Sequence, residues 1–92
     1  MMYVIKVHGF ATGEPCEVAG MYVLSFDFDA DDGVGMGVFT DELDLAKKFD
    51  APSEAVNFWQ SVSTVRPLRE DGKPNRPLTS SSVEIIPIER TL

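Results

Sequence analysis

Two apolar segments joined by a short acidic turn constrain the fold of this chain more than any other feature. The first segment, "MYVLSFDF", covers residues 21–28, and the second, "VGMGVF", covers residues 34–39. Alternation of apolar and polar residues is typical of strands, and the intervening "DADDG" has the composition of a tight turn. The two segments therefore predict a β-hairpin within an antiparallel sheet, although the glycines weaken the second strand.

Alternation along the first of these segments also predicts which of its faces is buried. Large apolar side chains occupy every second position, and we expect them to form the core face: Tyr22, Leu24, Phe26 and Phe28. The residues between them would lie on the opposite face: Val23, Ser25 and Asp27. The turn that follows would then carry a compact group of acids, which we call the acidic turn (residues 29–32).

The ends of the chain supply two further strands. Residues 3–7 alternate and are rich in β-branched side chains, so they predict a strand that Gly9 ends. Residues 82–88 predict a last strand, and Pro87 indicates that this strand lies at an edge of the sheet or stops there, because proline cannot donate a ladder hydrogen bond.

Helices are expected between the hairpin and the last strand. Thr40 or Asp41 could cap one or two helical turns within residues 40–50, which begin with acids and end with lysines. Pro52 stands where a main helix would begin. Its buried stripe would follow the spacing i, i+3, i+4 and i+7: Ala55, Phe58, Trp59 and Val62.

Taken together, the elements predict an α+β fold: a small antiparallel sheet of about four strands, packed by one main helix and a short helical turn. The 92 residues are enough for one domain, 1–92. A hydrophobic content of 43%, without an apolar run near the roughly 20 residues of a membrane span, predicts a soluble globular protein. One cysteine and a start unlike a signal peptide favour the cytoplasm.

Charge is distributed unevenly along the chain. Residues 1–55 hold 11 acids and 3 bases, for a net charge of −8, whereas residues 56–92 hold 4 acids and 5 bases, for +1. An acidic surface repels nucleic acid and is attracted to the cationic surfaces that bind it, although many acidic surfaces serve only solubility. The acidic half is thus compatible with a basic partner but does not by itself require one.

The acids at alternate positions in "FDFDADDG" resemble the start of a calcium loop. Such a loop needs glycine at position 6 and a bidentate glutamate at position 12. Counting from Asp27 places Asp32 at position 6 and Val38 at position 12, and Gly33 comes one place late. We therefore expect a strand end and a turn here, with no bound metal.

Candidate catalytic residues are few. His8 is the only histidine and Cys16 the only cysteine, and neither lies in a sequence frame typical of a nucleophile and its base. "GVGMG" is strand sequence without the helix that a phosphate-binding loop requires. Trp59 lies on the helical stripe, so we expect it in the core rather than stacked on a nucleic-acid base. The sequence predicts a protein that is not an enzyme and needs no cofactor.

A proline-rich segment between the main helix and the last strand concentrates positive charge. "TVRPLREDGKPNRPLTSS", residues 64–81, contains a tight turn in "EDGKPN" and two prolines that restrict the preceding arginines to extended conformations, so we expect it to be ordered. Its cations could pair with acids of the first half of the chain, or they could bind phosphates or carboxylates of a partner. They are half of the eight lysines and arginines in the chain: Arg66, Arg69, Lys73 and Arg76.

These segments resemble a family of short proteins from bacteriophages and prophages. The resemblance covers nearly the whole chain and is carried by "YVIKVHGFATGEP", "DLAKKFD", "EAVNFWQ" and above all "VRPLREDGKPNRPLT" running into "VEI". The family is identified as including an anti-CRISPR protein directed against a type I-F surveillance complex. An alternative within the same resemblance is a phage regulatory or accessory module that binds another host protein.

The resemblance implies a stoichiometric inhibitor in the host cytoplasm. It would bind the crRNA-guided type I-F complex through its Cas proteins, with the crRNA backbone as a further candidate contact, and keep target DNA from pairing with the guide. Binding to a membrane or to free DNA is not expected. The residues expected at the partner interface are those of the cationic segment and the acidic turn: Arg66, Arg69, Lys73, Asn75, Arg76, Asp29, Asp31 and Asp32.

Overall fold

A four-stranded antiparallel sheet forms the centre of the computed structural model, which describes residues 1–88. Its strands are β1 (Met2–Phe10), β2 (Tyr22–Asp27), β3 (Met36–Thr40) and β4 (Ser81–Ile88). They lie in the order β3-β2-β1-β4, with β1 and β4 paired along nearly their whole length. The predicted α+β fold is confirmed, and so is the position of Pro87 in an edge strand.

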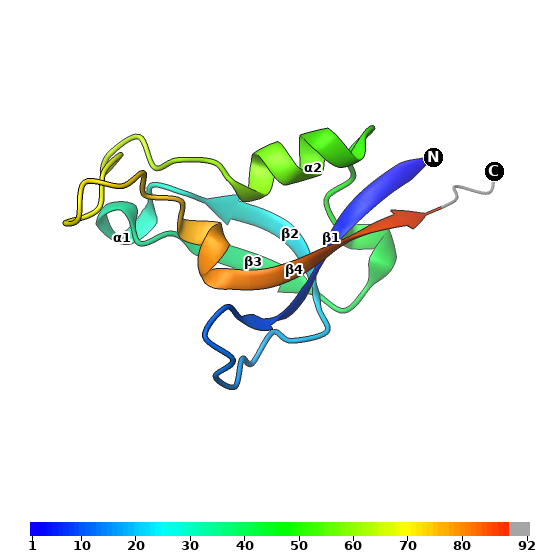
Figure 1. Ribbon diagram of the computed structural model, residues 1–92. Coiled ribbons are helices and arrows are strands. Elements are labelled where there is room, and N and C mark those ends of the chain that lie inside the picture. The colour runs from blue at the N-terminus through cyan, green and yellow to red at the C-terminus, as the bar shows by residue number, and fades with distance from the viewer. Residues whose placement is uncertain (89–92) are drawn as a thin grey trace.

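The main helix lies across one side of this sheet (Figure 1). Helix α2 (Pro52–Trp59) begins at Pro52 as predicted and buries Ala55 completely, with Phe58 and Trp59 partly buried. The helix ends before Val62, and Val62 is exposed. The predicted buried stripe was therefore wrong at this last residue. None of the helices within residues 1–88 has the length and apolar character needed to cross a membrane.

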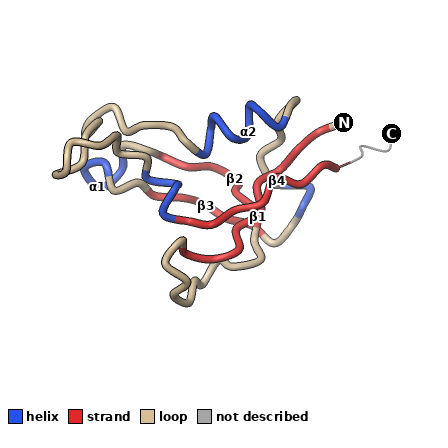
Figure 2. The backbone as a smooth tube through the Cα atoms, viewed as in Figure 1, coloured by secondary structure: helices blue, strands red, loops and turns tan. Residues whose placement is uncertain are grey.

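The remaining helical pieces are short. They are α1 (Ala30–Gly33) and the 3₁₀ turns η1 (Leu43–Leu45) and η2 (Pro77–Ser80), shown in blue in Figure 2. The helical turns expected within residues 40–50 are reduced to η1. Thr40 begins this segment with a side-chain turn, because its Oγ1 accepts a hydrogen bond of 3.0 Å from the backbone N–H of Glu42.

An apolar layer fills the space between the sheet and α2. Ile5 and Val7 alternate on β1 and are fully buried, and they pair with Ile85 and Val83 of β4. Aromatic rings extend the layer, since Phe58 of α2 contacts Phe28 and Phe49 with ring centroids 5.3 and 5.4 Å apart. The indole Nε1 of Trp59 donates a hydrogen bond of 3.2 Å to the carbonyl of Ser81, so Trp59 belongs to this layer.

A β-bulge corrects the predicted faces of β2. Val23 pairs with Phe39 and Phe26 pairs with Gly37, but the register shifts between Val23 and Ser25. Because residues 37 and 39 share a face, the bulge places Val23 and Phe26 on that same face, and Val23 is fully buried. The prediction that Val23 faces away from the core was therefore wrong, because an extra residue reverses the alternation at Leu24.

Other strand boundaries differ by a few residues. Strand β1 continues through Gly9 to Phe10, with a register shift between Val7 and Gly9 that accommodates the glycine. Strand β3 begins at Met36 rather than at residue 34, because the chain is still turning through Gly35, whose φ is +89°. The predicted hairpin between β2 and β3 is confirmed, and the turn that joins them is α1.

Candidate functional site

The cationic segment folds back on itself as a small hairpin. Backbone hydrogen bonds join Arg69 N–H to the Lys73 carbonyl at 2.8 Å and Asn75 N–H to the Pro67 carbonyl at 2.9 Å. Gly72 has a φ of +83°, which the tight turn requires and which glycine adopts without strain. We call residues 66–76 the cationic hairpin. As predicted, "EDGKPN" forms its turn.

Asp29 of the acidic turn anchors the segment that leads into this hairpin. Its Oδ1 accepts hydrogen bonds from Ser63 Oγ at 3.0 Å and from Thr64 N–H at 2.6 Å, and its Oδ2 accepts one from Thr64 Oγ1. Val65 N–H is a further donor to Oδ1, at 3.3 Å. The Thr64 hydroxyl, followed by the Thr64 backbone N–H, holds the pKa of the Asp29 carboxyl below its usual value, because these donors stabilise the carboxylate.

Asn75 joins the two sides of the junction directly. Its Nδ2 donates hydrogen bonds to the Gly33 carbonyl at 2.7 Å and to the Arg66 carbonyl at 2.9 Å. Gly33 is buried with a φ of +90°, and a Cβ placed on it would lie 2.5 Å from the Cβ of Arg66. Only glycine therefore permits this approach of the two backbones. We call this set of contacts around Asp29, Gly33 and Asn75 the polar junction.

The polar junction brings the predicted acids and cations to one end of the molecule. In Figures 1 and 2, α1 and the cationic hairpin lie side by side, opposite the end that carries the N-terminus. Asp31 and Asp32 are exposed there, with left-handed φ values of 51° and 56°. Left-handed backbone is tolerated better by aspartate than by most residues, so the acidic sequence suits this turn.

The cations of the hairpin make few interactions with the chain's own acids. Arg66 Nη2 lies 3.9 Å from Glu70 Oε1, within the hairpin itself. Among residues 1–88, no ion pair joins Arg69, Lys73 or Arg76 to an acid, and none joins any of the four cations to the acidic first half. The sequence left open whether these cations pair with acids of the first half of the chain or bind a partner. The structure shows no such internal ion pairs among residues 1–88.

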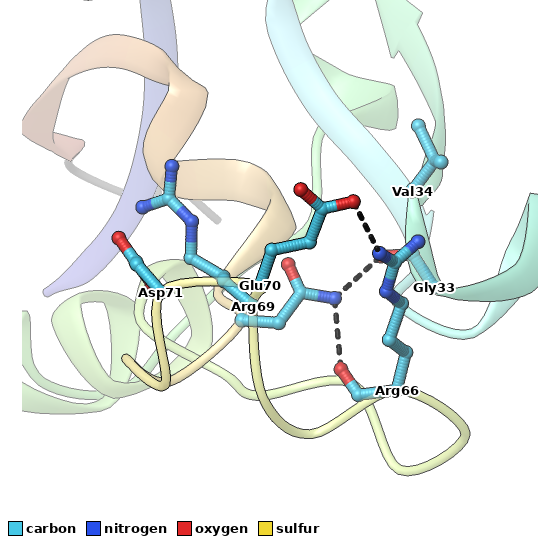
Figure 3. Close-up of a pocket in the computed structure, with 7 residues that line it drawn as sticks. Gly33, Val34, Arg66, Arg69, Glu70 and Asp71 are labelled. Carbon is cyan, nitrogen blue, oxygen red and sulfur yellow. Dashed lines mark hydrogen bonds and ion pairs between the residues drawn. The ribbon is translucent and has the colours of Figure 1, made fainter.

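Two open hollows adjoin the cationic hairpin. One, of about 430 Å³, is lined by Gly33, Val34, Arg66, Arg69, Glu70, Asp71 and Asn75 (Figure 3). The other, of about 510 Å³, shares Val34, Arg69 and Asn75 with the first and adds Arg76 and hydroxyl residues that include Thr12 and Thr79. In Figure 3 the Arg69 side chain points away from that of Arg66. Guanidinium groups beside hydroxyls suit planar or tetrahedral anions such as carboxylate and phosphate.

The predicted interface residues thus divide into two groups. Asp29 and Asn75 are committed to hydrogen bonds inside the chain, and their contact with a partner stays a prediction. Side chains at the surface include those of Asp31, Asp32, Arg66, Arg69 and Lys73, with Arg76 partly buried. The sequence did not reveal Ser63 and Thr64 as partners of Asp29, because 34 and 35 residues separate them from it.

The residues considered for catalysis lie elsewhere. His8 is at the surface as expected, and its Nε2 lies 2.9 Å from Oε1 of Glu84 on the paired strand β4. Cys16 is partly buried and free. Within residues 1–88, neither side chain forms a hydrogen bond with Asp29, Gly33 or Asn75.

Comparison with known proteins found no similar protein. No protein-family model matches the chain, and neither a curated protein nor a solved structure matches it.

Proposed function

We propose that this chain is a non-catalytic binding protein that presents the cationic hairpin to an anionic surface of its partner. The observation that carries the proposal is the contrast within the hairpin between its backbone and its side chains. The backbone is held by Asp29, Asn75 and its own hydrogen bonds, whereas Arg69, Lys73 and Arg76 have no acidic partner among residues 1–88. A held loop with unpaired guanidinium groups is suited to binding.

The energetics favour such a loop as a contact surface. Ordering a flexible segment on binding costs about 0.5 to 1.5 kcal/mol for each immobilised long side chain, in addition to the backbone cost. Pro67 and Pro74 and the hairpin hydrogen bonds reduce the backbone part in advance. Arginines buried at an interface are frequent hot spots worth about 2 kcal/mol or more. We assign this role to Arg69 and Arg76, which adjoin the second hollow.

We further propose that the partner is the crRNA-guided type I-F surveillance complex, as the phage-family resemblance implies. The charges support this choice in two ways. The hairpin would face acidic protein or guide-RNA phosphates, and the neighbouring Asp31 and Asp32 would face lysines that otherwise hold target DNA. Binding in this way would keep DNA from the guide without any chemical step.

Pull-down with a reconstituted type I-F complex, followed by a target-DNA capture assay, tests the proposal. The wild-type protein in stoichiometric excess should prevent DNA loading. If DNA loads normally, the inhibitor proposal is wrong. Co-purification from host extract then separates the alternatives, because only the inhibitor should bring down guide RNA, whereas a phage accessory module should bring down another host protein.

A charge-matched pair of variants tests the hairpin itself. Arg69→Gln combined with Arg76→Gln should weaken binding by about thirtyfold or more, the equivalent of one hot spot of about 2 kcal/mol. The control combines Asn57→Asp with Gln60→Glu, which changes the net charge equally at exposed positions on and just after α2. Equal loss of affinity in both pairs would show a general charge effect and contradict the hairpin as the contact surface.

A further inference from the structure

The two edges of the sheet differ in how they are protected from pairing with another strand. On β4, Pro87 offers no N–H, and the carbonyl of Ser81 already accepts the indole N–H of Trp59. Strand β3 contains neither proline nor lysine, the residues that commonly protect an edge. In the described chain, no hydrogen bond from outside the sheet reaches the backbone of residues 36–39. The β3 edge is therefore open.

The side chains beside this edge are apolar and exposed. Met36 is 64% exposed and Val38 is 53% exposed. They lie on the face opposite Phe39, which packs against the core cluster. An incoming strand that extended the sheet would cover both side chains while its backbone satisfied the open edge, as in recognition by β-strand addition.

Acidic residues flank the strand at both ends. Residues 27–44 contain seven acids and no lysine, arginine or histidine. Asp31 and Asp32 precede β3, and Asp41 and Glu42 follow it, all four exposed. The first two cations after this acidic stretch, Lys47 and Lys48, interact with other groups. Lys48 Nζ donates hydrogen bonds to three backbone carbonyls of residues 43–46, and Lys47 lies over the rings of Phe49 and Phe58.

Cations near the first end do not neutralise it. Arg66, Arg69 and Arg76 line hollows that Val34 also borders. Within residues 1–88, however, none of these arginines forms an ion pair with Asp31 or Asp32, and Arg66 pairs with Glu70. A strand added to β3 would therefore meet acids at both of its own ends. A second copy of this chain would bring the same acids together, which disfavours self-pairing.

We propose that the β3 edge binds an extended segment of a partner protein that carries apolar residues at alternate positions and lysine or arginine at both ends. The apolar positions would cover Met36 and Val38, the backbone would complete the ladder, and the basic ends would pair with the flanking acids. This surface adjoins the cationic hairpin near Val34 but consists of different residues. The proposal does not depend on the proposed function.

Binding of a synthetic peptide with the sequence KKVTVTVKK to the full chain, followed by two-dimensional amide NMR, tests the proposal. Shift changes should concentrate at residues 36–40, where outward-facing amides should also exchange more slowly. The peptide EEVTVTVEE should bind about tenfold more weakly or worse, because its ends meet like charges. Absence of binding, equal binding of both peptides, or shifts centred on the cationic hairpin would overturn the proposal.

Two further controls separate strand addition from simple charge attraction. N-methylation of alternate amides in the lysine peptide keeps its charge but removes its ladder hydrogen bonds, and it should abolish the slowed exchange. Val38→Lys should weaken binding, whereas Val65→Lys, at a similarly exposed valine outside the sheet, should not. If N-methylation has no effect, or if both lysine variants bind equally, strand addition is wrong.

The second-copy alternative is tested without peptide, by sedimentation of the protein over a range of concentrations. A monomer leaves the edge available, as the proposal requires. A dimer that Val38→Lys dissociates and Val65→Lys does not would assign the edge to a second copy of this chain and overturn the proposal.

Discussion

The apolar layer and the polar junction hold the molecule together by different means. Between the sheet and α2, fully buried aliphatic side chains pack on aromatic rings, and few polar groups take part. At the other region, around α1 and the cationic hairpin, Asp29 and Asn75 join distant backbone segments through hydrogen bonds. One region therefore depends on the amount of apolar surface removed from water, and the other on donors, acceptors and backbone conformation.

This difference indicates how the two regions can be altered independently. Loss of a packed side chain weakens the whole fold, because the apolar layer joins α2 to the sheet through β1 and β4. Loss of a hydrogen bond at the polar junction should first release the cationic hairpin, which contributes few apolar contacts to the core. Local opening of such segments occurs at lower free energy than global unfolding.

The largest effect is expected from Ile5→Ala. Ile5 is fully buried in the apolar layer, so truncation should reduce the free energy of unfolding by about 2 to 5 kcal/mol. Chemical denaturation measures this change, with Val56→Ala at an exposed position of α2 as the control. A small effect of Ile5→Ala, similar to the control, would contradict the description of this layer as the main source of stability.

The apolar layer was also the region that the sequence predicted best. Strand periodicity and β-branched composition located β1 and β4, and Pro52 with its following stripe located α2. The failure at Val23 has a physical reason, because a β-bulge inserts one residue and no local pattern in "MYVLSFDF" marks it. The periodicity of apolar residues thus predicts where strands and helices lie. It predicts which face of a strand is buried only where no β-bulge interrupts the pairing.

The next largest effect is the difference in stability loss between Gly33→Ala and Gly13→Ala. Both glycines have a positive φ, +90° and +85°, so each alanine should cost about 1 to 2 kcal/mol for the left-handed backbone. Only Gly33 adds a steric conflict, with Arg66 Cβ at 2.5 Å, which should cost roughly 1 to 3 kcal/mol more. Equal losses measured by thermal unfolding would show that the polar junction is not closely packed.

The polar junction could be predicted from the sequence only in part. The turn in "EDGKPN" and the concentration of arginines are local features, and both were evident. The hydrogen bonds of Asp29 to Thr64 and of Asn75 to Gly33 span 35 and 42 residues, and no spacing rule relates positions so far apart. Asp29 was therefore predicted as an acid for a partner, whereas the structure shows it bound to hydroxyl and backbone donors of its own chain.

Asp29→Asn should produce an effect that depends on pH. Because the folded-state pKa of Asp29 lies below its ordinary value of 3.8, the carboxylate adds stability that is complete above about pH 4 and is lost as the pH falls through the folded pKa. The variant should therefore be less stable than wild type at pH 7, and the deficit should shrink in acid. Denaturation at a series of pH values measures this, with the exposed Asp41→Asn as a control that should show little deficit. A deficit of the same size at every pH would contradict the role of the charge.

The smallest effect is expected from Glu70→Gln, which removes the ion pair with Arg66. The two atoms are 3.9 Å apart, with the Glu70 side chain 95% exposed, so the change in unfolding free energy should stay below about 0.5 kcal/mol. Yet the substitution removes one negative charge from the cationic hairpin and releases Arg66, so affinity for an anionic partner should rise and its salt dependence should steepen. Denaturation and binding measured at two salt concentrations check both statements. A variant that lost stability without gaining affinity would show that Glu70 stabilises the polar junction. The distinction between a backbone fixed by hydrogen bonds and side-chain charges free to bind a partner would then not hold at Glu70.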